Sequence, residues 1–370
     1  MQPIDMRRWQ ALILLQLLLG AGAQPYIGRD ADGNVVLQAP ANASIILNGV
    51  DIMDRLTELQ AQVAASNPLQ GPAPGSIFVA GGYAAEKYMT AAAMWLDSSG
   101  IWRPTTPMSQ PRAWHAMAWN PAMDQPCVIG GQGFDGPIGT VECYDLALRR
   151  WHAPAHIDPM PTPRSQAMIA AQGVEIFVVG GVTAGGQPSA LAHVLNLTTG
   201  HWTELPSLPV PRARGTAGFA NNTLIVAGGN EPSKGSVATT LYLHPQQARW
   251  LAGPALPILT EGLAGTTVAK GFVVVGGSSY LTSNANAQLL NSPSDPRWSG
   301  LPFLKIPLDF HALITMPDGA VVVLGGMKIT PQATTHSAWS FRLAPSGKQW
   351  VYHSSLPGPL YACASMALPA

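Results

Sequence analysis

A pair of adjacent glycines preceded by a short apolar run recurs six times along the chain at a nearly constant interval, and this repeat constrains the fold more than any other feature. The pairs begin at Gly81, Gly130, Gly180, Gly228, Gly276 and Gly325. Successive pairs are therefore 49, 50, 48, 48 and 49 residues apart. A fixed period of this length indicates one supersecondary unit in several copies, which bury their apolar faces by packing on one another.

The residues around each glycine pair follow a common pattern. A short apolar run precedes each pair and is typical of a strand buried on both faces. These runs cover residues 77–80, 127–129, 176–179, 224–227, 272–275 and 321–324. A polar turn and a second strand follow, as in residues 140–146, and then a tryptophan 21 to 25 residues past the first glycine. The tryptophans are Trp102, Trp151, Trp202, Trp250, Trp298 and Trp350, and a turn containing proline comes after each.

This combination of glycine pair, aromatic residue, tryptophan and Leu-Pro turn resembles the kelch repeat, whose period is close to 50 residues. The resemblance covers residues 76–370 and implies an all-β fold, a six-bladed kelch-type β-propeller built from four-stranded sheets. The first copy lacks the strand that the second has at residues 113–119. Because residues 359–364 align with residues 111–116, we expect the C-terminal strand to enter the first blade beside residues 77–80 and close the propeller.

The N-terminus has the pattern of a secretory signal peptide over residues 1–23. Arg7 and Arg8 precede an apolar run, which ends at the small residues 21–23. The run is about half as long as a membrane span, which needs roughly 20 residues, so we expect a secreted, extracellular chain without stable membrane insertion.

Residues 24–66 are expected to form short strands between Tyr26 and Leu47 and then a helix capped by Asp51. Apolar residues in the helix, residues 52–63, have the 4-3-4 spacing of a coiled coil. Two readings remain open: a stalk that forms a homo-oligomer such as a trimer, or a surface helix docked on the propeller. The proline-rich residues 67–75 read as a linker and favour the separate stalk.

An oxidising compartment would permit disulfides and glycosylation. Cys127 and Cys143 lie on predicted neighbouring strands and are either a disulfide or two buried free thiols, and Cys363 is left unpaired. Asparagines in the Asn-x-Ser/Thr pattern are expected glycosylation sites. They are Asn42, Asn196 and Asn221.

Charged side chains or histidine occur in the turn before the first strand of five blades, whereas the first blade has Leu360 there. With 20 Lys and Arg against 20 Asp and Glu, the net charge is zero, which argues against a nucleic-acid partner. If these turns line one mouth of the propeller, they offer a ligand site of split charge; alternatively, the arginines make structural contacts between loops. The candidate residues are Arg112, Arg164, Arg212, Arg214, Glu261, Asp309 and His311.

No set of residues has the pattern of a catalytic or metal site, and no cofactor is predicted. His152 and His156 flank Pro154 in a turn rather than sharing a helix face. The sequence therefore favours a secreted, non-catalytic binding module for an extracellular protein or glycan. The alternative is a carbohydrate-active kelch enzyme similar to the sialic-acid mutarotases, and a copper enzyme similar to galactose oxidase is less favoured.

Overall fold

The computed structural model describes residues 72–369, except 85–87, 98 and 245–247, together with four short strands nearer the N-terminus. The chain divides into two compact units, residues 1–70 and 71–370. In the first unit, β1 (Tyr26–Arg29) pairs with β2 (Val35–Gln38), and β3 (Ile46–Leu47) pairs with β4 (Val50–Asp51). The predicted short strands are thus confirmed. The predicted signal peptide, the helix over 52–63, residues 67–71 of the linker and Asn42 lie outside the described residues.

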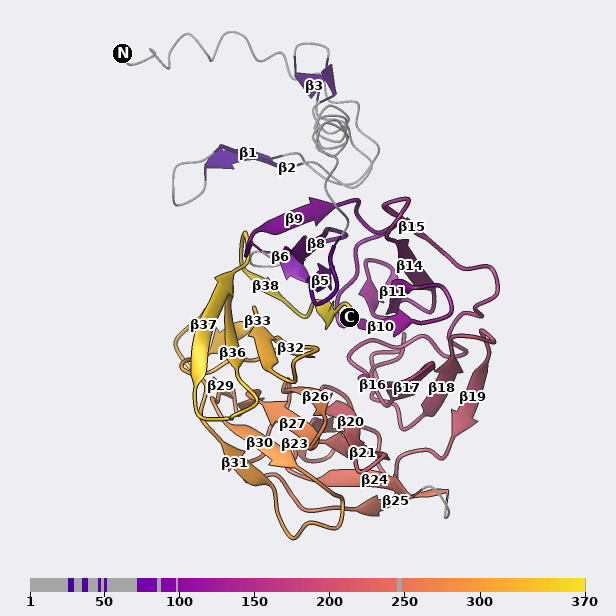
Figure 1. The fold of residues 1–370 in the computed structure, drawn as a ribbon, viewed down its shortest axis with the longest axis vertical. Coiled ribbons are helices and arrows are strands. Elements are labelled where there is room, and N and C mark those ends of the chain that lie inside the picture. The colour runs from indigo at the N-terminus through magenta and orange to yellow at the C-terminus, as the bar shows by residue number, and fades with distance from the viewer. Residues whose placement is uncertain are drawn as a thin grey trace. The chain divides into compact units, whose positions relative to one another are not determined.

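The second unit is built from four-stranded antiparallel sheets, which confirms the all-β prediction (Figure 1). Sheet 1 is β39 (Ala364–Ala367), β5 (Ile77–Ala80), β8 (Ala93–Leu96) and β9 (Trp102–Thr105). Sheet 2 is β10 (Ala116–Asn120), β11 (Gln125–Ile129), β14 (Val141–Asp145) and β15 (Arg150–His152). Sheet 3 is β16 (Met168–Gln172), β17 (Glu175–Val179), β18 (Ala192–Asn196) and β19 (Trp202–Leu205).

The other three sheets follow the same order. Sheet 4 is β20 (Thr216–Ala220), β21 (Thr223–Ala227), β24 (Thr240–His244) and β25 (Arg249–Ala252). Sheet 5 is β26 (Ala264–Val268), β27 (Gly271–Val275), β30 (Ala287–Leu290) and β31 (Ser299–Leu301). Sheet 6 is β32 (Ala312–Thr315), β33 (Val321–Leu324), β36 (Trp339–Leu343) and β37 (Trp350–Ser355).

Small hairpins follow most of the glycine pairs. They are β12 (Gln132–Gly133) with β13 (Gly136–Pro137), β22 (Asn230–Glu231) with β23 (Gly235–Ser236), β28 (Ser278–Ser279) with β29 (Thr282–Ser283), and β34 (Met327–Ile329) with β35 (Thr334–His336). After the first glycine pair, the hairpin of β6 (Tyr83–Ala84) and β7 (Tyr88–Met89) gains β38 (Leu360–Tyr361) as a third strand and forms a separate small sheet. The described residues contain no helix, and so none that could cross a membrane.

The C-terminal strand completes the first sheet, as the sequence predicts. β39 pairs with β5 in the register Ala364↔Ala80 to Ala367↔Ile77, and on its other side β5 pairs with β8. The chain end thus supplies the innermost strand that residues before β5 do not provide.

Apolar side chains between neighbouring sheets form the core. In sheet 1, Ile77 and Val79 of β5 share a buried cluster with Val322 and Leu324 of sheet 6. The opposite face of β5 packs on sheet 2 through Phe78, which lies 5.2 Å from the ring of Tyr144. Strands buried on both faces explain the continuous apolar runs before the glycine pairs.

In five of the six repeats, the tryptophan donates a hydrogen bond that ties its sheet to the preceding one in sequence. Trp151, for example, donates its indole N–H to the carbonyl of Thr106 at 2.9 Å, and Trp350 donates to Pro302 at 2.8 Å. Trp202, Trp250 and Trp298 do the same. Trp102 has no such partner among the described residues.

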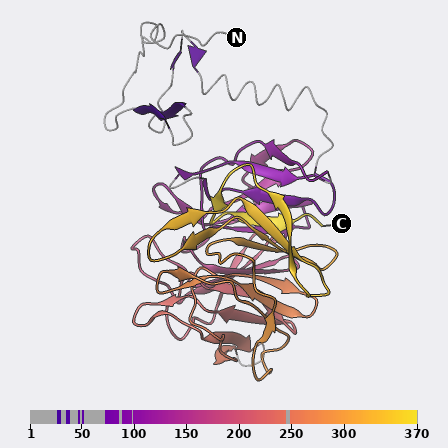
Figure 2. The same cartoon turned by 90° about the vertical axis from the view of Figure 1, so that its left-hand side faces the viewer.

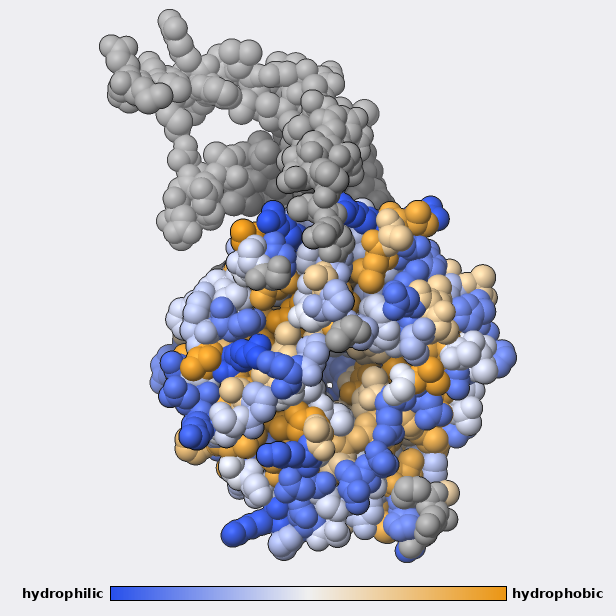
Figure 3. All heavy atoms as spheres, in the orientation of Figure 1, coloured by the Kyte–Doolittle hydropathy of each residue, from blue (hydrophilic) through white to orange (hydrophobic). Residues whose placement is uncertain are grey.

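The inner strand of each sheet, β10, β16, β20, β26, β32 and β39, lines one central cavity of about 500 Å³. Figure 1 shows β10, β16, β20, β26 and β32 nearest the middle of the unit, where the C-terminus also lies, and Figure 2 shows the unit from the side. The face turned toward the viewer in Figure 3 is hollowed near its centre.

Candidate functional site

The residue two positions before each inner strand has a left-handed backbone conformation. The φ angles are 50° for Trp114, 54° for Gln166, 58° for Arg214, 66° for Gly262, 50° for Phe310 and 51° for Ala362. Only glycine adopts such angles without strain, so the five others are held there at a cost of about 1–3 kcal/mol each. These six residues, which we call the mouth, line a cavity of about 130 Å³ that shares lining residues with the central cavity.

Backbone hydrogen bonds join the mouth residues into a belt. In five of the six, the N–H donates to the carbonyl of the mouth residue of the preceding sheet, with sheet 6 preceding sheet 1. The bonds run from Trp114 to Ala362 at 2.9 Å, Ala362 to Phe310 at 2.8 Å, Phe310 to Gly262 at 2.9 Å, Gly262 to Arg214 at 2.7 Å and Arg214 to Gln166 at 3.0 Å. No bond from the Gln166 N–H to the Trp114 carbonyl is present between these two described residues.

One half of the mouth is polar and charged. Arg214 donates from Nε to Oε1 of Gln166 at 2.7 Å, and its Nη1 lies 3.7 Å from Oε2 of Glu261. The Arg214 side chain remains 43% exposed, so it can still meet a ligand. Arg214 thus lies at the mouth with Glu261 beside it, and a role of either in ligand binding stays a prediction.

Asp309 lies beneath this polar half and is fully buried. Its Oδ1 accepts the Phe310 N–H at 2.9 Å, and its Oδ2 has no hydrogen-bond partner. Burial raises the pKa of Asp309 to about 6, and the nearby Glu261 carboxylate adds to the rise. Asp309 also explains the glycine at 262, since a Cβ there would fall 1.7 Å from Oδ1.

The other half of the mouth is aromatic. The Trp114 and Phe310 rings lie edge to face with centroids 6.4 Å apart, and Trp114 also packs on Tyr83 at 5.0 Å. Tyr83 in turn stacks on Tyr361 at 5.0 Å. The sequence analysis missed Tyr83, Phe310, Tyr361 and Gln166. Their positions in the repeat could have identified them, because each precedes an inner strand or follows a glycine pair.

His311 lines the wall of the mouth cavity, and burial lowers its pKa to about 4, so its imidazole is neutral near pH 7. His115 takes the corresponding place in sheet 2, with its pKa lowered to about 3 by burial and by Arg112. The ring nitrogens of both are buried without hydrogen-bond partners. Among the described residues, no group of three His, Cys, Asp or Glu side chains could hold a metal ion.

Comparison with known proteins assigns the repeat. Residues 163–209, which span all four strands of sheet 3 and its flanking turns, match the family model of the Kelch motif. The chain therefore contains a kelch motif. Kelch domain-containing protein 8B of Homo sapiens and that of Pongo abelii are each 41% identical to it over 73 residues, or 20% of this chain. The match spans 19% of the length of these relatives.

An arginine precedes the inner strand in three of the sheets, and its side chain does not face the mouth. Arg112, Arg164 and Arg212 are only 0%, 1% and 2% exposed. The prediction that their guanidinium groups line the mouth is corrected: each chain turns inward between the loops. The alternative interpretation, that these arginines make structural contacts between loops, agrees with their burial.

Two of these arginines have a buried acid as partner. Arg112 pairs with Glu142 and donates to the Gly130 carbonyl, and Arg212 pairs with Glu231 at 2.5 Å. Arg164 instead donates to the Leu191 carbonyl at 2.7 Å and to Nδ1 of His193 at 2.9 Å. Its buried charge thus has no carboxylate beside it in the described contacts.

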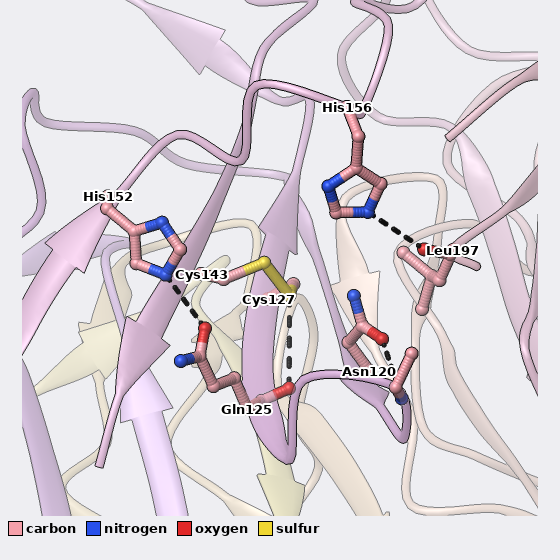
Figure 4. The surroundings of a disulfide bond; sticks show 8 residues. Asn120, Gln125, Cys127, Cys143, His152, His156 and Leu197 are labelled. Carbon is pink, nitrogen blue, oxygen red and sulfur yellow. Dashed lines mark hydrogen bonds between the residues drawn. A yellow bond between two sulfur atoms is a disulfide. The ribbon is translucent and has the colours of Figure 1, made fainter. Parts of the chain in front are cut away.

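Cys127 and Cys143 form a disulfide between the paired strands β11 and β14, with Cα atoms 4.0 Å apart (Figure 4). This decides between the two readings of the sequence. The disulfide lies in an apolar cluster with Ile176 and Leu195 of sheet 3. Cys363 is a free thiol, whose pKa burial raises to about 12.

The histidines around the disulfide do not form a ligand pair. His152 lies 2.8 Å from Oε1 of Gln125, and His156 lies 3.4 Å from the carbonyl of Leu197 (Figure 4).

The two described glycosylation candidates differ in their surroundings. Asn221 is exposed in the turn between β20 and β21. Oδ1 of Asn196 accepts the N–H groups of Thr198 and Thr199, each at 3.0 Å, and its side chain is partly buried.

Proposed function

We propose that this chain is a secreted, non-catalytic binding module, and that its sheets form a closed six-bladed propeller whose mouth face recognises an extracellular protein. The β39–β5 pairing and the apolar cluster between sheets 6 and 1 support closure. The N-terminal sequence pattern and the disulfide support secretion, because disulfides persist in oxidising compartments.

One observation carries the binding role. Tyr280 and Leu281 form the tip of the β28–β29 hairpin with φ of 48° and 63°, and they are 84% and 73% exposed. A turn of this backbone favours Asn-Gly, so two large apolar residues there add strain and bury nothing within the described structure. Strained residues of this kind are typical of functional sites.

The hairpin stands beside the mouth, since Ser278 of β28 bridges to Glu261. In sheet 2, the corresponding β12–β13 hairpin carries Phe134, which is 68% exposed. In a six-bladed ring, sheets 2 and 5 are opposite one another, so the mouth lies between two apolar tips. Apolar anchors around a polar centre fit a protein partner.

The test compares the secreted protein with a Tyr280→Asn/Leu281→Gly variant on an array of extracellular protein domains and an array of glycans. Because Asn-Gly suits the turn, we expect the variant to melt at the same or a higher temperature and to lose its protein partner. A matched control is Lys234→Gln, at the exposed tip of the β22–β23 hairpin.

Equal protein binding by both proteins would refute the site. Binding to glycans alone would move the ligand to the carbohydrate class, and turnover of a bound sugar would favour the enzyme alternative. Homo-oligomerisation through residues 52–63 is a separate part of the proposal, which sedimentation of the chain with and without residues 24–71 tests. An unchanged mass after glycosidase treatment would contradict glycosylation at Asn42, Asn196 and Asn221.

A further inference from the structure

The belt of backbone hydrogen bonds around the mouth is open at one place. Five of the six junctions between mouth residues carry an N–H to carbonyl bond of 2.7–3.0 Å. At the sixth, between sheets 2 and 3, the N–H of Gln166 and the carbonyl of Trp114 have no hydrogen-bond partner among the described residues. An unpaired backbone donor and an unpaired acceptor thus stand on the two sides of one opening.

The inner strands are also separated at this junction. β10 contacts β39, and the pairs β16–β20, β20–β26, β26–β32 and β32–β39 are in close contact, whereas β10 and β16 have at most sparse contact. Small side chains line this junction, among them Ala116 and Ala167. The apolar cluster around the disulfide still joins sheets 2 and 3, and it includes Ala118 of β10 and Ile169 of β16. The opening is therefore local to the mouth.

Trp114 and Gln166 both line the mouth cavity of about 130 Å³, which exceeds the space needed by a single water. The indole N–H of Trp114 is also buried without a hydrogen-bond partner. Unpaired polar groups of this kind cost about 1–3 kcal/mol each when buried, so a ligand that pairs with them gains affinity.

We propose that the opening between Trp114 and Gln166 binds an amide group of the protein partner, as a main-chain peptide inserted into the mouth. This inference rests on the proposed function and names the chemistry at its centre. A trans secondary amide carries its N–H and its carbonyl on opposite edges. Its carbonyl accepts from the Gln166 N–H and its own N–H donates to the Trp114 carbonyl, which completes the belt as the sixth link.

The surrounding side chains fit such a group. The Trp114 and Phe310 rings offer an apolar wall for the groups that flank an amide, and Gln166 and Arg214 are already paired with one another. Gln166 leaves its backbone N–H free while its side chain is occupied. The amide is thus recognised by hydrogen bonds to the main chain of Gln166 and Trp114 and by packing against the aromatic rings beside them.

The experiment titrates the folded protein with N-methylacetamide and follows the backbone N–H resonance of residue 166 by TROSY NMR. The control ligand is N,N-dimethylacetamide, which accepts a hydrogen bond and has no N–H to donate. We expect a saturable downfield shift with N-methylacetamide and a weaker, non-saturating one with the control. Equal responses, or no response at residue 166, overturn the proposal and leave the opening to solvent.

Two variants test the wall without removing the opening. Gln166→Gly and Trp114→Gly both fit the left-handed backbone and keep the N–H of residue 166 and the carbonyl of residue 114. The first should retain the response, and the second should lower the affinity for N-methylacetamide because the aromatic wall is lost. The reverse order contradicts the geometry. A failed amide titration with intact binding on the protein array overturns this inference alone, whereas loss of array binding concerns the proposed function.

Discussion

A carboxylate placed beside Arg164 should stabilise the protein. Glu142 lies opposite Val128 in sheet 2, and His193 lies opposite Val178 in sheet 3. Val128 and Val178 each stand two residues before a glycine pair, so His193 occupies the place from which Glu142 neutralises Arg112. The change His193→Glu therefore supplies the missing partner.

The magnitude follows from the burial of Arg164. Desolvation lowers its pKa to about 10 from an ordinary value of 12.5, which corresponds to about 3 kcal/mol of unfavourable free energy. Because the new carboxylate must itself be desolvated, we expect a net gain of about 1–2 kcal/mol. At about 2–4 °C for each kcal/mol in domains of 150–250 residues, the melting temperature should rise by a few degrees.

Thermal unfolding of His193→Glu and of the neutral control His193→Gln gives the measurement. Arg164 lowers the pKa of the paired carboxylate, so its stabilisation is present above the unfolded pKa of about 4.3 and is lost as the pH falls below it. A His193→Glu protein that melts no higher than His193→Gln at pH 7 would show that a neighbouring carboxylate does not stabilise the buried Arg164 charge.

Three further predictions concern other parts of the structure. Asp309→Asn should raise the melting temperature at about pH 8 and leave it nearly unchanged at about pH 4. The folded pKa of Asp309 is raised to about 6, so its stabilisation is full below the unfolded pKa and lost as the pH rises through 6; equal effects at both pH values contradict this. Cys127→Ala/Cys143→Ala should lower the free energy of unfolding by about 2–4 kcal/mol in urea titrations, and an unchanged midpoint would show that the disulfide constrains little. Deletion of residues 359–370 removes β38 and β39 and should abolish cooperative unfolding in calorimetry; a truncated chain with the full-length melting temperature would disprove the role of β39.

The spacing of the repeat predicted the sheets, because equivalent residues in each copy of the repeat form equivalent strands. The alignment of residues 359–364 with residues 111–116 was enough to place β39 beside β5, since equivalent segments of a repeat occupy equivalent strands. The sequence predicted the disulfide only as one of two alternatives, because the register that places Cys127 opposite Cys143 depends on the length of the intervening turn.

The site was harder to predict because spacing locates a residue in a loop without giving the direction of its side chain. Arg212 and Arg214 are the same residue type two positions apart. Arg212 is buried against Glu231, and Arg214 is exposed at the mouth. The difference lies in the left-handed φ of Arg214, which a single sequence does not reveal at a residue other than glycine. Phe310 was missed for the same reason.

The pairing of β39 with β5 can form only late in the synthesis of the chain. Residues Ile77 and Ala367 are direct partners although 290 positions separate them (367 − 77). At about 5–20 residues per second, a ribosome needs about 15–60 s to travel between them. During that interval the inner edge of β5, which contains Phe78 and Val79, lacks its partner strand β39. Nascent chains should therefore stay open to chaperone binding until β39 has been translated, and stalling shortly before residue 364 should leave a protease-sensitive chain.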